Sequence, residues 1–143
     1  MRSSAISMLA AALLAALAHA AAPNMKEGLW EITARMEMAG MPAPMPPQTM
    51  QQCITKKELE DPGKTAPGSQ QDPRCKIADY KLQGNTASWK MACQGEGAMS
   101  GSGSITYSGT SYSGVNKMTM SHGGQAQNMT MTYSGRHIGE CKK

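Results

Sequence analysis

Methionine is the residue type whose number and spacing in this chain most suggest chemistry. Residues 36–50, MEMAGMPAPMPPQTM, contain five methionines and four prolines. Thioether sulfur is a soft donor that suits Cu(I), and imidazole is a borderline partner for it. One hypothesis is therefore a copper site at which several sulfurs and one imidazole converge. Its candidate ligands are Met38, Met41, Met45, Met50 and His122.

The same segment has two explanations that need no metal. Its prolines predict a loop over residues 39–49, because proline cannot donate to a sheet and favours extended backbone. That loop would either cover the open end of a sheet as an apolar lid or present its side chains to another protein of the bacterial envelope. Copper is the one cofactor that the sequence suggests, and all three hypotheses stay open.

Residues that could perform catalysis are sparse. Beyond residue 20 the chain contains two histidines, His122 and His137, and neither stands in a spacing that makes a metal site, such as HExxH. The serines between 100 and 104 have no recognisable base and orienting acid, so we expect them in turns and on exposed sheet. No catalytic residue is predicted, and we expect a protein that is not an enzyme.

The first twenty residues predict export. Arg2 supplies a positive start, residues 6–17 form a short apolar run, and Ala18-His19-Ala20 fits the cleavage pattern of a secretory signal peptide. The run is shorter than the roughly 20 residues of a membrane-spanning helix, so no transmembrane anchor is expected. The sequence thus predicts an exported protein with a signal peptide at 1–20 and a single disulfide-bonded domain at 21–143.

Charge argues against nucleic acid as a partner. The chain has 14 lysines and arginines against 10 acidic residues. The basic residues are spread along the sequence, whereas a nucleic-acid surface needs a clustered basic stripe. We expect a monomer, with an apolar small molecule or an envelope protein as the candidate partner.

Alternation of apolar and polar residues predicts strands. Residues 28–38 place Trp30 and the apolar positions that follow it on one side, which indicates a half-buried strand. A short strand at 50–55 leads into a helical turn at 55–59, which a Thr55-x-x-Glu58 capping box begins.

The rest of the chain predicts hairpins. Gly84-Asn85 is a turn signal between strands at 76–83 and 86–93, and the glycine-rich strand 97–107 suits a sheet that bends sharply. The fold class is therefore all-β, a mainly antiparallel meander of about seven or eight strands curled into a small barrel or half-barrel.

Repeated Met-Thr-Met and Tyr-Ser-Gly motifs indicate the register of the last strands. A turn at 109–110 sets Tyr107 against Tyr112. A loop centred on residues 124–125 turns four methionines to one face and the threonines to the other. The predicted methionine pairs are Met118 with Met131 and Met120 with Met129.

These methionines lead to the main functional hypothesis. In a chain without phenylalanine, unbranched methionine fills the interior, and a buried methionine cluster also resembles a pocket for an apolar ligand. We expect a non-catalytic periplasmic protein that binds an apolar small molecule or lipid-like group, with loop 39–49 as its lid. The predicted ligand-binding set is Trp30, Met36, Trp89, Met91, Met118, Met120, Met129 and Met131.

Four cysteines predict two disulfides, each worth roughly 2–4 kcal/mol. They are Cys53, Cys75, Cys93 and Cys141. A tight turn at 84–85 would point Cys75 and Cys93 to opposite faces of their hairpin, which disfavours joining them. Of the two remaining connectivities, Cys53–Cys75 with Cys93–Cys141 is preferred, because Cys53–Cys75 closes a loop locally.

Several motifs resemble one known family. They are the start PNMKEGLWE at 23–31, Gln52-Cys53, the central Cys75 and Cys93, and the closing stretch 133–141. Together they resemble the bacterial exported proteins grouped as domain of unknown function 3617. The resemblance implies a periplasmic protein with disulfides and no established activity, and it carries over no catalytic or binding residues.

Overall fold

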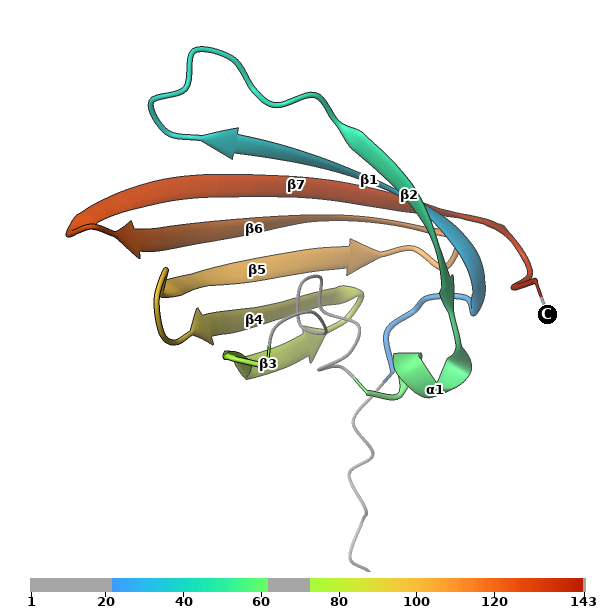
Figure 1. Ribbon diagram of the computed structural model, residues 1–143. Coiled ribbons are helices and arrows are strands. Elements are labelled where there is room, and N and C mark those ends of the chain that lie inside the picture. The colour runs from blue at the N-terminus through green and yellow to red at the C-terminus, as the bar shows by residue number, and fades with distance from the viewer. Residues whose placement is uncertain (1–21, 62–72, 143) are drawn as a thin grey trace, which may run out of the picture.

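The described residues of the computed structural model, 22–61 and 73–142, form one antiparallel sheet of seven strands and one helical turn (Figure 1). The elements are β1 (Gly28–Met38), β2 (Gln48–Ile54), α1 (Lys56–Leu59), β3 (Cys75–Gln83), β4 (Thr86–Cys93), β5 (Met99–Tyr107), β6 (Ser111–His122) and β7 (Gln125–Gly139). Within these residues no helix is long and apolar enough to cross a membrane. The predicted signal peptide at 1–20 lies outside them.

The sheet confirms the all-β prediction and selects the half-barrel over the barrel. Its strand order is β2-β1-β7-β6-β5-β4-β3, so β3 to β7 form a meander and β1 joins the last strand of the chain. β2 and β3 are the two edges, and the sheet curls between them without closing (Figure 1). Alternate residues of β4 are buried in strict sequence, which is the pattern of a sheet that has one dry face.

Glycines on the dry face let the sheet curl tightly. A Cβ on Gly103 would lie 2.6 Å from the ring of Trp89, and one on Gly114 would lie 2.5 Å from the ring of Tyr133. A Cβ on Gly101 would overlap the backbone of Lys117 in the neighbouring strand. The glycine-rich strand β5 therefore lies at the predicted bend, where neighbouring strands and rings come too close for a Cβ atom.

A β-bulge in β3 makes the predicted register of the β3–β4 hairpin wrong beyond its first pairs. An unbroken hairpin around a tight turn at 84–85 would pair Leu82 with Ala87 and Ala78 with Met91. Leu82 does lie opposite Ala87, but the register shifts between Ala78 and Lys81, so Ile77 rather than Ala78 faces Met91. Inside the bulge Asp79 adopts a φ of 53°, a left-handed conformation that aspartate tolerates better than most residues.

The same bulge makes the predicted disulfide connectivity wrong. The shift brings Cys75 directly opposite Cys93, and the two form a disulfide with their Cα atoms 3.9 Å apart. The second disulfide joins Cys53 to Cys141 with a Cα separation of 5.4 Å. Cys53 pairs with Leu29, which also pairs with Gly139, so this bond links β2 to the end of β7 across β1.

The β6–β7 register differs from the prediction by two residues. The turn lies at Gly123-Gly124, and Met118 faces Met129 instead of Met131. A shift by an even number keeps every side chain on its predicted face, because side chains alternate along a strand. The pairing of Tyr107 with Tyr112 is confirmed, as is the capping box of Thr55 and Glu58 at α1.

Candidate binding site

Cross-strand pairing gathers methionines from four strands at one end of the dry face, which we call the inner face. Met36 lies opposite Met131, Met38 opposite Met129, and Met99 opposite Met120. Directly opposed side chains have Cβ atoms about 5 Å apart, so these pairs are in reach of one another. We call this group the methionine end: Met36, Met38, Met99, Met118, Met120, Met129 and Met131.

The methionine end is only partly buried. Met118 and Met129 are 8% and 7% exposed and belong to the core, whereas the other five pack against the core and stay partly accessible. β1 and β6 end there, and β5 and β7 begin there (Figure 1). The sheet thus offers a surface of soft, flexible apolar side chains beside its rigid centre.

Aromatic rings fill the opposite end of the inner face. The ring centroids of Trp30 and Tyr112 are 5.3 Å apart. Tyr112 packs edge-on against Tyr107 and Tyr133, with centroid separations of 6.2 and 6.4 Å. Burial raises the pKa of Tyr112 to about 12, and it raises the pKa values of Tyr107 and Tyr133 as well. These phenols stay neutral at physiological pH and serve as a rigid core.

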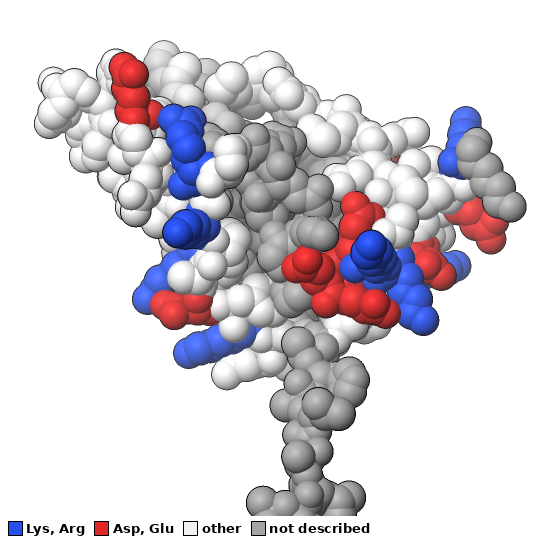
Figure 2. All heavy atoms as spheres, turned by 60° about the horizontal axis from the view of Figure 1, so that its bottom comes forward, with Lys and Arg blue, Asp and Glu red and all other residues white. Residues whose placement is uncertain are grey.

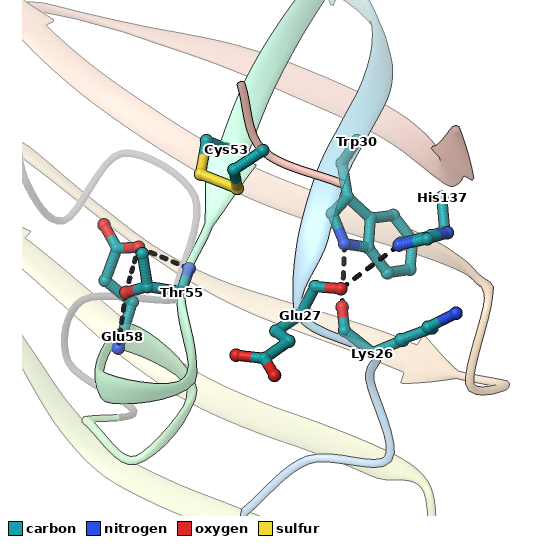
Figure 3. Close-up of a disulfide and its surroundings, with 8 residues drawn as sticks. Lys26, Glu27, Trp30, Cys53, Thr55, Glu58 and His137 are labelled. Carbon is teal, nitrogen blue, oxygen red and sulfur yellow. Dashed lines mark hydrogen bonds between the residues drawn. A yellow bond between two sulfur atoms is a disulfide. The ribbon is translucent and has the colours of Figure 1, made fainter. Parts of the chain in front are cut away.

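The segment before β1 fixes Trp30 by backbone contacts (Figure 3). The indole nitrogen of Trp30 donates to the carbonyl oxygen of Lys26 at 2.9 Å, and Nε2 of His137 donates to that of Glu27 at 3.1 Å. Gly28 has a φ of 136°, and a Cβ there would overlap the His137 ring. In the Gly-Leu-Trp-Glu motif, Gly28 thus allows close packing against His137, and Trp30 is held in place at this end of the sheet.

Two polar groups lie among the apolar side chains of the inner face. Asn116 is 4% exposed and sits in register between Gly103 and Met131, and its Oδ1 accepts from the Tyr133 hydroxyl at 3.4 Å. The hydroxyl of Tyr80 is buried and has no hydrogen-bond partner within the described residues. Neither residue belongs to the ligand-binding set predicted from the sequence. Asn116 could have been found from the alternation in β6, because a residue two positions before the inward-facing Met118 points to the same face.

The predicted ligand-binding set divides by exposure. Trp30 is 0% exposed, and Trp89, Met91, Met118 and Met129 are buried as well. These five residues form the core beneath the surface. The accessible members of the set are Met36, Met120 and Met131.

The candidate copper ligands do not converge on one point. Met41 and Met45 lie in the connection between β1 and β2, and His122 lies at the β6–β7 turn. Met50 lies opposite Ile32 of the neighbouring strand β1. Ile32 precedes Met38 by six residues along β1, so Met50 and Met38 are separated by roughly 20 Å. Copper binding stays a prediction from the sequence.

The β1–β2 connection lies at the rim of the methionine end. The backbone N–H of Ala39 donates to the carbonyl oxygen of Asn128 at 3.0 Å, and that of Met45 donates to Met36 at 3.2 Å. Figure 1 shows this connection at the edge formed by β1 and β2, away from β3 and β4. Met41 and Met45 are 49% and 40% exposed there.

The family suggested by the sequence motifs is found by direct comparison. A family model described as "Protein of unknown function (DUF3617)" matches residues 25–141, which include all seven strands and both disulfides. No curated protein and no solved structure matches the chain.

Proposed function

We propose that this chain, which belongs to the family of unknown function DUF3617, is a non-catalytic protein that binds an apolar small molecule or lipid-like group at its methionine end. The observation that carries the proposal is the incomplete burial of five methionines on the inner face of an unclosed sheet. These five are Met36, Met38, Met99, Met120 and Met131.

Incomplete burial leaves hydrophobic free energy to be gained. Each methylene group removed from water contributes about 0.8 kcal/mol, so an alkyl chain that buries about ten of them gains roughly 8 kcal/mol before the cost of association. Methionine suits such a ligand, because its unbranched thioether adapts to a chain with many conformers.

The polar groups of the inner face would orient the ligand. Ligand sites are commonly apolar with a few well-placed polar groups, and Asn116 lies beside Met131 on the inner face. A ligand acceptor atom near the Tyr80 hydroxyl would supply the hydrogen bond that this buried group lacks.

The disulfides are compatible with an exported location, which would suit the same proposal. Disulfides persist in oxidising compartments such as the periplasm, and the described cysteines are paired in two of them. We place the protein in the bacterial periplasm, where a carrier for poorly soluble molecules would be useful.

Fluorescence titration of the domain 21–143 with phenylnaphthylamine, a neutral apolar dye, tests the proposal. We expect saturable binding that the paired change Met120→Gln and Met131→Gln weakens by about tenfold or more. Met50→Gln is the matched control, since Met50 is 52% exposed and lies far from the methionine end. Near-ultraviolet circular dichroism verifies that each variant is folded.

Two outcomes would oppose the proposal. One is a wild-type protein that does not bind the dye saturably. The other is equal weakening by Met50→Gln and by the paired change, which would place the dye on general apolar surface rather than at the methionine end.

A further inference from the structure

A groove bordered by lysines and serines runs along the outer face of β3 to β6, opposite the inner face. Its volume is about 480 Å³. Three lysines and three serines give it its character: Lys81, Lys90, Lys117, Ser88, Ser102 and Ser104. It lies on the far side of the sheet from the methionine end, so it cannot be part of the apolar site.

Strand register explains how the groove forms. Ser88 lies between Lys81 and Ser104 in one cross-strand row. Ser102 lies between Lys90 and Lys117 in the next row. Short serine side chains thus make a floor, and long lysine side chains rise around it, with all three hydroxyls on one face of the sheet.

The charge of the groove is positive. Asp79, placed by the bulge, pairs with Lys90 at 2.9 Å. Lys81 and Lys117 form no ion pair within residues 22–61 and 73–142. Three ammonium groups therefore face one carboxylate. Figure 2, in which the β3 side comes forward, shows basic side chains gathered mainly along one side of the molecule and a mixed group of acidic and basic ones on the other.

From this arrangement we infer that the outer groove binds a phosphate group carried by a small molecule or by a lipid headgroup. Ammonium groups bind phosphate as point charges, and serine hydroxyls donate to its oxygens. Lys117 lies across the serine floor from Lys81 and Lys90, so an anion with several oxygens can be contacted from two sides.

Nucleic acid fits the groove poorly. Single strands are held by basic grooves in which aromatic rings stack on the bases. The aromatic residue that borders this groove, Trp89, is 3% exposed and directs its ring to the core on the inner face. The groove therefore offers charge and hydroxyl groups but no stacking surface.

Amide chemical-shift titration with glycerol phosphate and sedimentation with phosphatidylglycerol vesicles test the inference on the domain 21–143. Glycerol phosphate probes the free source of the group, and the vesicles probe the headgroup. Glycerol and phosphatidylcholine vesicles are the respective controls. Shifts concentrated at β3 to β6 with glycerol phosphate, or selective sedimentation with phosphatidylglycerol, would support the site and identify its source.

The paired change Lys81→Gln and Lys117→Gln should weaken whichever binding is found by about tenfold or more. Lys56→Gln with Lys57→Gln removes the same charge from exposed residues of α1 and should leave the affinity nearly unchanged. The inference is overturned if neither probe binds above its control, or if both paired changes weaken binding equally, as general charge attraction would. Dye binding at the methionine end should be unaffected by either pair, which keeps the two sites distinguishable.

Discussion

Replacing Gly103 by alanine should destabilise the domain, although alanine is normally the better strand residue. Alanine gains about 0.5–1 kcal/mol over glycine in an element interior. At this position, however, the new Cβ would lie 2.6 Å from two carbons of the Trp89 ring and would also overlap Oδ1 of Asn116. Carbon atoms in contact are normally about 3.5–4.0 Å apart, so the ring must move by about 1 Å.

The Trp89 ring has little room to move, because the residue is 3% exposed. Overpacking of this kind costs about 1–3 kcal/mol, which leaves a net loss of up to about 2.5 kcal/mol after the strand preference is subtracted. The expected fall in Tm is up to roughly 10 °C, from about 4 °C per kcal/mol for a domain of this size.

Thermal and urea unfolding, followed by circular dichroism, measure this effect. Ser102→Ala is the matched control, since Ser102 is the exposed neighbour on the outer face, and it should change the stability by less than about 0.5 kcal/mol. A Gly103→Ala protein that is more stable than the wild type by about 0.5–1 kcal/mol, as the strand preference alone predicts, would refute the packing of Trp89 over Gly103, and with it the described curl of the sheet.

Three further changes have defined outcomes. Replacing Cys53 and Cys141 together by serine should lower the free energy of unfolding in urea by about 4–5 kcal/mol, because the bond closes a loop of 88 residues; a loss below about 1 kcal/mol would contradict this. Tyr80→Phe should leave the unliganded domain equally stable or raise its stability by about 1 kcal/mol, since it removes a buried hydroxyl without a hydrogen-bond partner among the described residues. A clear loss of stability in urea unfolding would instead show that the hydroxyl makes a stabilising hydrogen bond. Because burial raises the pKa of Tyr112 to about 12, the folded state holds the phenolic proton longer than the unfolded state, whose value is about 10. Stability should therefore be full below about pH 10 and fall as the pH rises toward 12, and phenolate absorbance that develops near pH 10 without unfolding would contradict the burial of this ring.

Much of the fold follows from local patterns in the sequence. The alternation in residues 28–38 and the turn at Gly84-Asn85 predict β1 and the β3–β4 hairpin, because a half-buried strand has a period of two and a tight turn needs glycine. The capping box at Thr55 is equally local. Each of these features depends on residues within a few positions of one another.

Register was harder to predict than strand position. Asp79 looks like an ordinary outward residue of a strand, and no local signal shows that the chain gains an extra residue there. That one residue reverses which faces Cys75 and Cys93 occupy relative to each other, so the disulfide prediction failed with it. In the β6–β7 hairpin either of two glycine-containing turns fits the sequence, and both keep the methionines inward.

The candidate sites depend on contacts between distant segments, which a single sequence does not encode in any local pattern. The pairing of β1 with β7 is what completes the methionine end, and it joins residues about a hundred positions apart. The outer groove likewise arises from serines and lysines on four strands, each of which alone looks like an ordinary solvated position.

The most direct test of the proposed function follows the methyl resonances of isotope-labelled methionines while phenylnaphthylamine is added. If the ligand binds at the methionine end, the signals of Met36, Met120 and Met131 shift together and saturate, and those of the exposed Met41 and Met50 do not. Saturable shifts confined to Met41 and Met50, with the signals of Met36, Met120 and Met131 unmoved, would contradict the account.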